Sequence, residues 1–305
     1  MNMNTSGVRS SVAALLAGIA LAGCGGEGGT STLHLNITDA PVTGATTVWV
    51  QFIGVEAKPV GAPAESFEFS PARGFDLLTL QNGNAATLLP DATVPAGQYE
   101  WVRLIVDPAP GSSYVVDGTG QHGLRIPSGM QTGLKLVRGF TMPAGGRADF
   151  TIDFLLDKSI IAPPGQSPDY QMKPVLRMTD NIEAGTLVGS FAAPTLAAIA
   201  ACTDKAPVVY LYEGAAVVPD DIFNPADGSP DTAPTVDPLV TTTAALVSGV
   251  YTYKVAFLQA GTYTAAFTCN TDDPLVDENT TTPLNFVVYA LPVTISTGQT
   301  ATANF

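Results

Sequence analysis

Short runs in which apolar and polar residues alternate constrain the fold of this chain more than any other feature. The clearest runs cover residues 33–37, 48–52 and 150–154. Side chains of a β-strand point alternately to its two faces, so a period of two predicts strands with one buried face. Residues 99–106 are apolar on both faces apart from two charged positions, which is typical of a central strand. Turn signals separate the runs, so the pattern predicts an all-β protein.

Composition agrees with strands and turns. The chain has 305 residues, of which 46% are hydrophobic and 13% charged, and such a chain buries enough apolar surface to fold. Its Thr, Val, Gly and Pro favour strands and tight turns over helices. The length favours two domains over one. A second series of strand-like runs begins near Gly185. We therefore predict two tandem antiparallel β-sandwiches, residues 32–182 and 183–305, of the immunoglobulin or prealbumin kind.

The N-terminus has the features of an export signal. Residues 12–22 are apolar and follow a polar leader with one basic residue, Arg9. This run is too short to span a bilayer, which indicates a cleaved signal peptide over residues 1–23. Residues 21–24, Leu-Ala-Gly-Cys, resemble a bacterial lipobox. The resemblance implies cleavage before Cys24 and acylation of that residue. The alternative is an ordinary secretory signal that ends near a cysteine.

The residues after the signal and the net charge limit location and partners. Residues 24–31 are Gly-rich and predict a flexible tether. Gly25, rather than Asp, follows Cys24. By resemblance to Gram-negative sorting patterns, this implies an outer membrane lipoprotein that faces the periplasm or the cell surface. The net charge of −14 opposes binding to nucleic acid or to anionic lipid head groups. The expected partners are the membrane, through the lipid, and an unidentified envelope protein or glycan.

With Cys24 acylated, two cysteines remain, Cys202 and Cys269. In an exported chain they most simply form one disulfide, and two buried free thiols are the alternative. Cys269 continues the face of Tyr263 and Phe267 on one predicted strand, so its thiol is expected to point into the core. In the chain-entropy model, a disulfide that closes the loop between Cys202 and Cys269 stabilises the fold by roughly 4 kcal/mol.

One turn recurs along the chain. Residues 94–99, 142–146 and 258–263 each contain Ala-Gly and are each followed by an alternating strand. The glycine is expected to adopt a positive φ, and the aromatic residue after it, where present, is expected to enter the core. The recurrence in both halves supports two sandwiches of a related kind.

The first half also resembles a known family. The resemblance is carried, in this order, by residues 38–41 (Thr-Asp-Ala-Pro), 75–83, 95–99, 103–107 and 173–177. They resemble the bacterial lipoprotein domain known as domain of unknown function 4382, over roughly residues 32–180. This resemblance implies a β-sandwich and an exported lipoprotein, and it brings no activity and no catalytic residues. The second half resembles carboxypeptidase-regulatory or prealbumin-like repeats, mainly through residues 185–189 and 258–263.

Sequence motifs for catalysis are absent. The two histidines, His34 and His122, lie far apart in the sequence. The chain lacks the His-Glu-x-x-His metal motif, the Gly-x-Ser-x-Gly nucleophile elbow and a phosphate-binding glycine loop. No free cysteine is expected in the mature protein. We therefore predict that the protein is not an enzyme and has no catalytic residues. A hydrolase that works through two carboxylates is the alternative, although no pair stands out.

Two acidic loops of the second half are candidates for binding calcium. The candidate ligands are Asp220, Asp221 and Asp227 in one loop and Asp272, Asp273 and Asp277 in the other. Clustered carboxylates suit hard cations. Neither loop follows the Asp-x-Asp-x-Asp-Gly pattern of calcium loops, so solvated turns are the simpler interpretation. No other cofactor is expected.

Two arginines and two tryptophans lie among apolar residues. Arg103 and Arg177 are expected to pair with buried acids such as Asp76 or Asp107. The tryptophans are expected to be core residues rather than a platform for sugars.

The sequence as a whole predicts a lipid-anchored, non-catalytic cell-envelope protein that acts as a binding or scaffolding module. A calcium- or glycan-binding adhesin-like module is the alternative.

Overall fold

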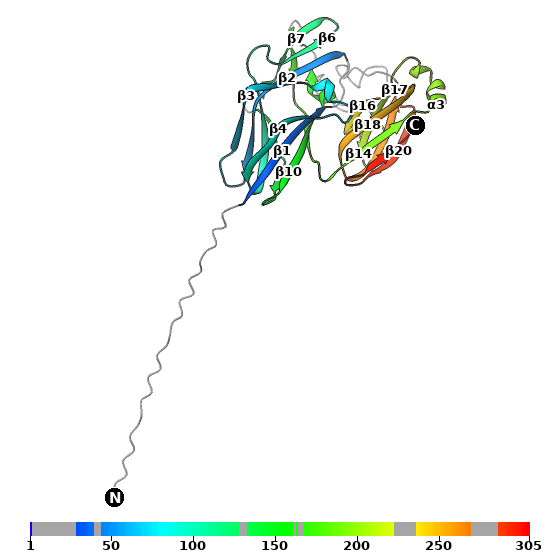
Figure 1. The fold of residues 1–305 in the computed structure, drawn as a ribbon. Helices are drawn as coiled ribbons and strands as arrows, with labels where there is room; N and C mark the ends of the chain where they lie inside the picture. The colour runs from blue at the N-terminus through cyan, green and yellow to red at the C-terminus, as the bar shows by residue number, and fades with distance from the viewer. Residues whose placement is uncertain are drawn as a thin grey trace.

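The computed structural model describes residue 1 and residues 29–39, 44–127, 133–161, 163, 168–222, 236–269 and 286–305. Apart from Met1, the predicted signal peptide lies outside these residues, and so do Cys24 and most of the predicted tether. Two β-rich bodies lie side by side (Figure 1). Within the described parts of the chain, no helix is long and apolar enough to cross a membrane.

The first body consists of two sheets. Its strands are β1 (Thr30–Asp39), β2 (Ala45–Pro59), β3 (Glu65–Asp76), β4 (Ala86–Pro95), β5 (Gly97–Val106), β6 (Tyr114–Asp117), β7 (Gly120–Arg125), β8 (Leu134–Leu136), β9 (Phe140–Met142), β10 (Arg147–Phe154), β11 (Ile160–Ile161), β12 (Tyr170–Met172) and β13 (Leu176–Asp180). One sheet has the order β13-β10-β1-β4, and the other has the order β11-β12-β7-β6-β2-β5-β8. In the larger sheet β3 also pairs with β2, and β9 with β5. Two short helical turns, η1 (Leu77–Leu80) and α2 (Leu156–Ser159), connect strands.

The core of the first body follows the alternation in the sequence. Leu33, Leu35 and Ile37 of β1 are fully buried, and so are Val48 and Val50 of β2. All five belong to one apolar cluster that both sheets contribute to. Burying a side chain of this size stabilises the fold by about 1.5–3 kcal/mol. The period of two therefore sets which face of each strand points inward.

The second body has two smaller sheets. Its strands are β14 (Ala184–Ser190), β15 (Val208–Glu213), β16 (Val240–Thr243), β17 (Ala245–Val247), β18 (Val250–Gln259), β19 (Gly261–Thr268), β20 (Val288–Ile295) and β21 (Thr300–Thr302), with the short helices α3 (Ala193–Ala197) and η2 (Ala200–Cys202). The sheet orders are β17-β18-β14-β21 and β16-β15-β19-β20. A separate apolar cluster fills the space between them and includes Leu187, Val209 and Phe267.

The prediction of an all-β sandwich protein is confirmed, with one difference in strand direction. Most pairs are antiparallel, as predicted, but β1 pairs with β10, β7 with β12, and β14 with β21 in parallel. The pattern of alternation could not indicate this, because side chains alternate in the same way in both kinds of ladder.

The recurring Ala-Gly turn has the same function in both bodies. The hydroxyl of Tyr99 donates a hydrogen bond of 2.8 Å to the carbonyl of Pro95, and that of Tyr263 donates one of 2.7 Å to Gln259. Both rings are buried, as predicted. This contact resembles the tyrosine corner of immunoglobulin-like sandwiches. The expected positive φ occurs at Gly97, whose φ is 136°, and at Gly145, whose φ is 66°, but not at Gly261.

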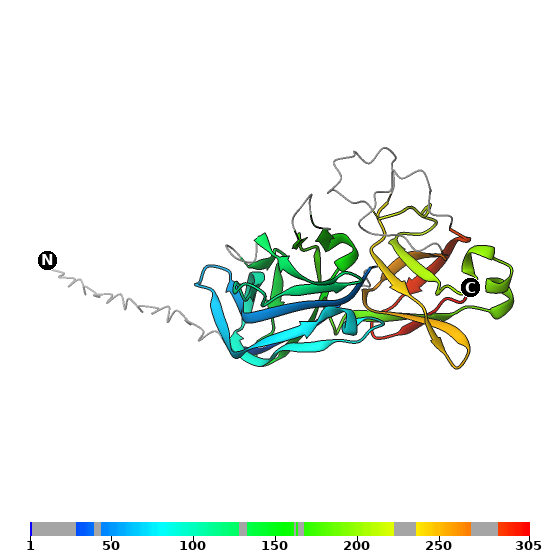
Figure 2. The ribbon, with the colours of Figure 1, turned by 90° about the horizontal axis from the view of Figure 1, so that it is seen from above.

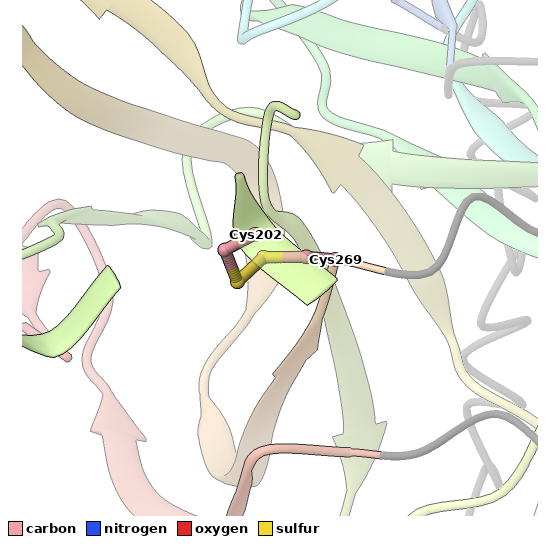
Figure 3. The surroundings of a disulfide bond; sticks show 2 residues. All are labelled: Cys202 and Cys269. Atoms are coloured by element: carbon pink, nitrogen blue, oxygen red, sulfur yellow. A yellow bond between two sulfur atoms is a disulfide. The ribbon is translucent and has the colours of Figure 1, made fainter. Parts of the chain in front are cut away.

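The predicted disulfide between Cys202 and Cys269 is confirmed (Figure 3). Cys202 ends η2, and Cys269 directly follows β19, with 4.9 Å between the two Cα atoms. Cys269 is fully buried and belongs to the core of the second body, as the face that it shares with Phe267 predicts. The bridge thus ties the irregular segment before β15 to a central strand.

The two bodies also contact each other (Figure 2). Leu155 follows β10 of the first body, yet its side chain packs into the apolar cluster of the second body. The hydroxyl of Thr242 in β16 donates a hydrogen bond of 3.1 Å to the side chain of Asn82 in the first body. The segment from Leu155 to the end of α2 is therefore part of the boundary between the bodies.

Candidate binding pocket

A cavity of about 390 Å³ lies at the end of β5 in the first body. Its walls are the loop between β5 and β6, the second half of β7, and Asp169 before β12. The lining residues are Val106, Asp107, Pro108, Ala109, Pro110, Gly111, Ser112, Ser113, Gly123, Leu124, Arg125, Ile126 and Asp169. An apolar lining with a few polar groups is typical of small-ligand sites, which measure about 300–1,000 Å³.

Hydrogen bonds hold the loop between β5 and β6 in place. The Oδ1 atom of Asp107 accepts from the backbone N–H of Ala109 at 2.9 Å, and the hydroxyl of Ser112 donates to the carbonyl of Asp107 at 2.8 Å. The hydroxyl of Ser113 accepts from the backbone N–H of Gln51 at 3.2 Å. Both serine hydroxyls are therefore engaged by the backbone, and this wall of the pocket is defined before any ligand binds.

Asp169 lies against β7 because Gly123 has no side chain. A Cβ atom at residue 123 would lie 2.7 Å from Oδ1 of Asp169, so any other residue would displace the carboxylate. The neighbours of Asp169 are held as well. The carbonyl of Pro168 lies 2.9 Å from Nδ1 of His122, and the hydroxyl of Tyr170 donates to Oδ2 of Asp117 at 2.7 Å. The carboxylate of Asp169 is thus positioned from both sides.

Asp117 organises the turn between β6 and β7. Its Oδ1 atom accepts from the hydroxyl and the backbone N–H of Thr119, both at 2.7 Å, and from the N–H of Gly120 at 3.1 Å. The hydrogen bonds from the Thr119 hydroxyl and then from Tyr170 hold the pKa of Asp117 far below the usual range of a carboxyl group. Nε2 of His122 lies 3.2 Å from the same oxygen. Asp117 therefore joins the hairpin to β12 and supports the pocket from outside it.

The charges of the pocket indicate which ligands it accepts. Two acidic residues, Asp107 and Asp169, and one basic residue, Arg125, line the pocket of a chain whose net charge is −14. Ionised carboxylates only accept hydrogen bonds, and an acidic surface repels anions. The apolar side of the pocket includes Leu124 and Ile126, both buried. A ligand with several hydroxyl groups and one apolar face complements both sides.

The calcium candidates are only partly within the described residues. Asp220 contacts the hydroxyl of Tyr212 through its backbone, whose N–H donates to that hydroxyl at 3.1 Å. Oδ1 of Asp221 accepts from the N–H of Ile222 at 2.6 Å. Among the residues that the structure describes, no group of three or more His, Cys, Asp or Glu side chains could hold a metal ion. The other four candidates, Asp227, Asp272, Asp273 and Asp277, lie outside the described residues, so calcium binding stays a prediction.

Arg103 and Arg177 pair with acids other than those predicted. Nη1 of Arg103 lies 3.1 Å from Oε2 of Glu56, and Nη2 of Arg177 lies 2.6 Å from Oδ2 of Asp153. The reason is strand register, because each pair lies directly opposite on neighbouring strands, β2 with β5 and β10 with β13. The two predicted partners instead accept hydrogen bonds from backbone N–H groups of turns.

The other residues considered as sites lie away from the pocket. Trp101 is 8% exposed but lies outside the apolar cluster of the first body, and the cationic groups of Arg103 and Lys135 each lie 4.6 Å from its ring centroid. Trp49 is half-buried rather than in the core, and it stacks on Tyr114 with 6.1 Å between ring centroids. Neither tryptophan lines the pocket, so the structure brings no tryptophan platform to it.

Comparison with known proteins supports the family resemblance of the first half. Residues 30–174 match the domain of unknown function DUF4382. The resemblance predicted for this region is thereby confirmed. No curated protein matches the sequence.

Similar solved structures are distant. A leucine-rich repeat protein from Bacteroides thetaiotaomicron is 11% identical, with a TM-score of 0.22. The match covers 90% of this chain and 26% of the repeat protein, so this chain spans about a quarter of the length of the repeat protein. The minor pilin of Streptococcus agalactiae is 12% identical, with a TM-score of 0.19 and 89% and 94% of the two chains covered. A candidate cell adhesion protein from Bacteroides fragilis is 8% identical, with a TM-score of 0.20 and 88% and 92% covered. Such scores lie below those of proteins that share a fold, so the architecture rests on the strand pairing described above.

Proposed function

We propose that this protein is a lipid-anchored, non-catalytic binding module of the cell envelope, with its ligand site in the pocket beside β7. The construction of the pocket carries the proposal. Hydrogen bonds hold the loop from Asp107 to Ser113, and Asp169 occupies the space that the missing side chain of Gly123 leaves. A site that is ordered before binding loses less conformational entropy when the ligand arrives.

The side chains of the pocket favour binding over catalysis. Among the described lining residues there is no His, Cys, Lys or Glu. A serine nucleophile needs an adjacent base, and the hydroxyls of Ser112 and Ser113 are instead bonded to the backbone. These observations favour binding over serine or thiol catalysis. The alternative of a hydrolase that works through two carboxylates falls on Asp107 and Asp169, and shortened oligosaccharides after incubation with the protein would favour it.

The expected ligand is a neutral, hydroxyl-rich molecule, such as a segment of a glycan. The carboxylates of Asp107 and Asp169 accept hydrogen bonds from hydroxyl groups, and the apolar side formed by Leu124 and Ile126 contacts the C–H face of a sugar ring. The acidic surface excludes anionic polymers such as nucleic acid.

An array of neutral oligosaccharides tests this assignment with the full-length protein in detergent. Asp169→Asn removes the charge of one acceptor, and a hydrogen bond to a charged group is worth about 1.5–3 kcal/mol, so affinity is expected to fall about tenfold to a hundredfold. Leu124→Trp fills the cavity and is expected to abolish binding. Glu100→Gln, an exposed carboxylate on β5, is the matched control and leaves binding unchanged. Failure of the unsubstituted protein to bind any neutral oligosaccharide would refute the ligand class, and equal affinities in all variants would refute the pocket.

The proposed membrane anchor is an acylated Cys24, in a protein of the outer membrane. The lipobox-like residues 21–24 support it, and more than one acyl chain gives stable anchoring. Mass spectrometry of the protein extracted from membranes is expected to show residues 24–305 with the added mass of acyl chains. Cys24→Ser is expected to abolish both the cleavage and the added mass. A mature chain that starts elsewhere and carries no acyl group would contradict the proposal.

A further inference from the structure

A buried aspartate lies at the contact between the two bodies. Asp157 belongs to α2 of the first body and is 6% exposed. Its Oδ2 atom accepts a hydrogen bond of 2.8 Å from the hydroxyl of Thr241 in β16 of the second body. Leu155, two residues before Asp157, packs into the core of the second body. Closing the contact therefore removes Asp157 from water, and opening it returns the carboxyl group to water.

The closed contact does not compensate a negative charge on Asp157 fully. Among the described residues, its Oδ1 atom has no hydrogen-bond partner. The charged groups on the surrounding elements are Asp39 on β1, Lys158 on α2, Asp153 on β10, Arg177 on β13, Asp237 before β16 and Lys254 on β18. Lys158 lies 3.1 Å from Asp237, and Arg177 lies 2.6 Å from Asp153, so these two cations have carboxylates of their own. The third, Lys254, lines a small cavity together with Asp39 and Asp153. A buried neutral carboxyl group costs far less free energy than a buried carboxylate with one unpaired oxygen.

We propose that Asp157 makes the contact between the two bodies sensitive to pH. The contact is closed while Asp157 is neutral, and it loosens when Asp157 ionises. The two bodies therefore hold a fixed relative position in mildly acidic medium and gain freedom as the medium becomes neutral.

The direction and size of the effect follow from the pKa of the carboxyl group. Burial raises the pKa of Asp157 from 3.8 to about 6, and the charge of Asp153 adds to the rise, whereas the hydrogen bond from Thr241 and the charge and backbone N–H of Lys158 offset part of it. With the contact open, the pKa returns to its ordinary value. Because the closed state has the higher pKa, the stabilisation is fully present below pH 3.8 and is lost as the pH rises through about 6. The closing equilibrium changes by on the order of 100-fold across this range.

Distances between nitroxide labels, measured by electron paramagnetic resonance in the full-length protein in detergent, test the proposal. Labels are attached through Ser66→Cys on β3 and Leu246→Cys on β17, both exposed positions. The distance distribution of the otherwise unsubstituted protein is expected to be narrow at pH 4.5 and to broaden by pH 7.5. Asp157→Asn, which is neutral and has the same shape, is expected to keep the narrow distribution at both pH values.

Two further variants separate titration from packing. Asp237→Asn makes the same chemical change at an exposed carboxylate of the same contact, and it is expected to retain the pH response. Thr241→Val removes the donor that stabilises the carboxylate, so the midpoint of broadening is expected to move to higher pH. An unsubstituted protein without a pH response, or a response that persists in Asp157→Asn, overturns the proposal. If Asp157→Asn does not fold, Thr241→Val tests the proposal by itself. A midpoint at higher pH supports the proposal, and an unchanged or lower midpoint overturns it.

Discussion

Removal of the disulfide, in the double variant Cys202→Ala with Cys269→Ala, is expected to lower the free energy of unfolding of the second body by about 2–5 kcal/mol. The bridge joins residues 67 positions apart, and a cross-link over such a loop strongly restricts the unfolded chain. Both half-cystines are buried in the core, so alanine also leaves space that the surroundings fill only in part.

The distribution of aromatic residues allows this effect to be assigned to one body. The two tryptophans of the chain, Trp49 and Trp101, both lie in the first body. Their fluorescence therefore reports unfolding of that body, whereas far-ultraviolet circular dichroism reports both. In urea, the double variant is expected to show an earlier transition by circular dichroism that fluorescence does not share. Reduction of the disulfide in the unsubstituted protein is expected to produce the same earlier transition by circular dichroism. Equal urea midpoints for the oxidised protein and the variant would contradict a stabilising disulfide.

Arg177→Met is expected to destabilise the first body by about 3–5 kcal/mol, because it leaves a buried carboxylate without its counter-ion. The side chains of Arg177 and Asp153 are 14% and 6% exposed and lie 2.6 Å apart. Methionine fills much of the volume of arginine, so the loss reports charge more than packing. The double variant Arg177→Met with Asp153→Leu is expected to recover most of the loss, since neither charge is then buried alone.

Arg147→Met is the matched control for this prediction. Arg147 begins β10, and its side chain is 47% exposed beside Asp91 and Asp149. Exposed ion pairs contribute about 0–1 kcal/mol, so the same substitution there is expected to change the urea midpoint of tryptophan fluorescence only slightly. Similar midpoints for the two arginine variants would show that the buried pair makes no special contribution to stability.

Much of the architecture could be predicted from local sequence pattern. The alternation at residues 33–37 identified β1 and its buried face, and the Ala-Gly turns at Tyr99 and Tyr263 indicated that both bodies use the same corner. The disulfide was predictable because, besides Cys24 in the predicted lipobox, the chain has two cysteines, one of them on an inward face. These features depend on residues close together in the sequence or on a count of very few candidates.

The pocket could not be predicted in this way. Asp107 and Asp169 lie on segments far apart in the chain, and they share a cavity because β7 pairs with β6 on one side and with β12 on the other. The parallel pairing of β7 with β12 left no signal in the alternation. One local clue existed at Gly123, where a glycine at the centre of a short strand is consistent with close approach of another group.

The sequence by itself determined the class of fold, the inward face of each main strand, the cysteine pair and the acidic net charge, because each follows from side-chain type and short-range spacing. The tertiary structure alone decided the partners of the buried charges. Arg177 meets Asp153 through the register of β10 and β13, and Asp157 meets Thr241 only where the two bodies touch. Strand register and the docking of the two bodies depend on many weak contacts between segments that are distant in the sequence. No short stretch of sequence is therefore enough to predict them.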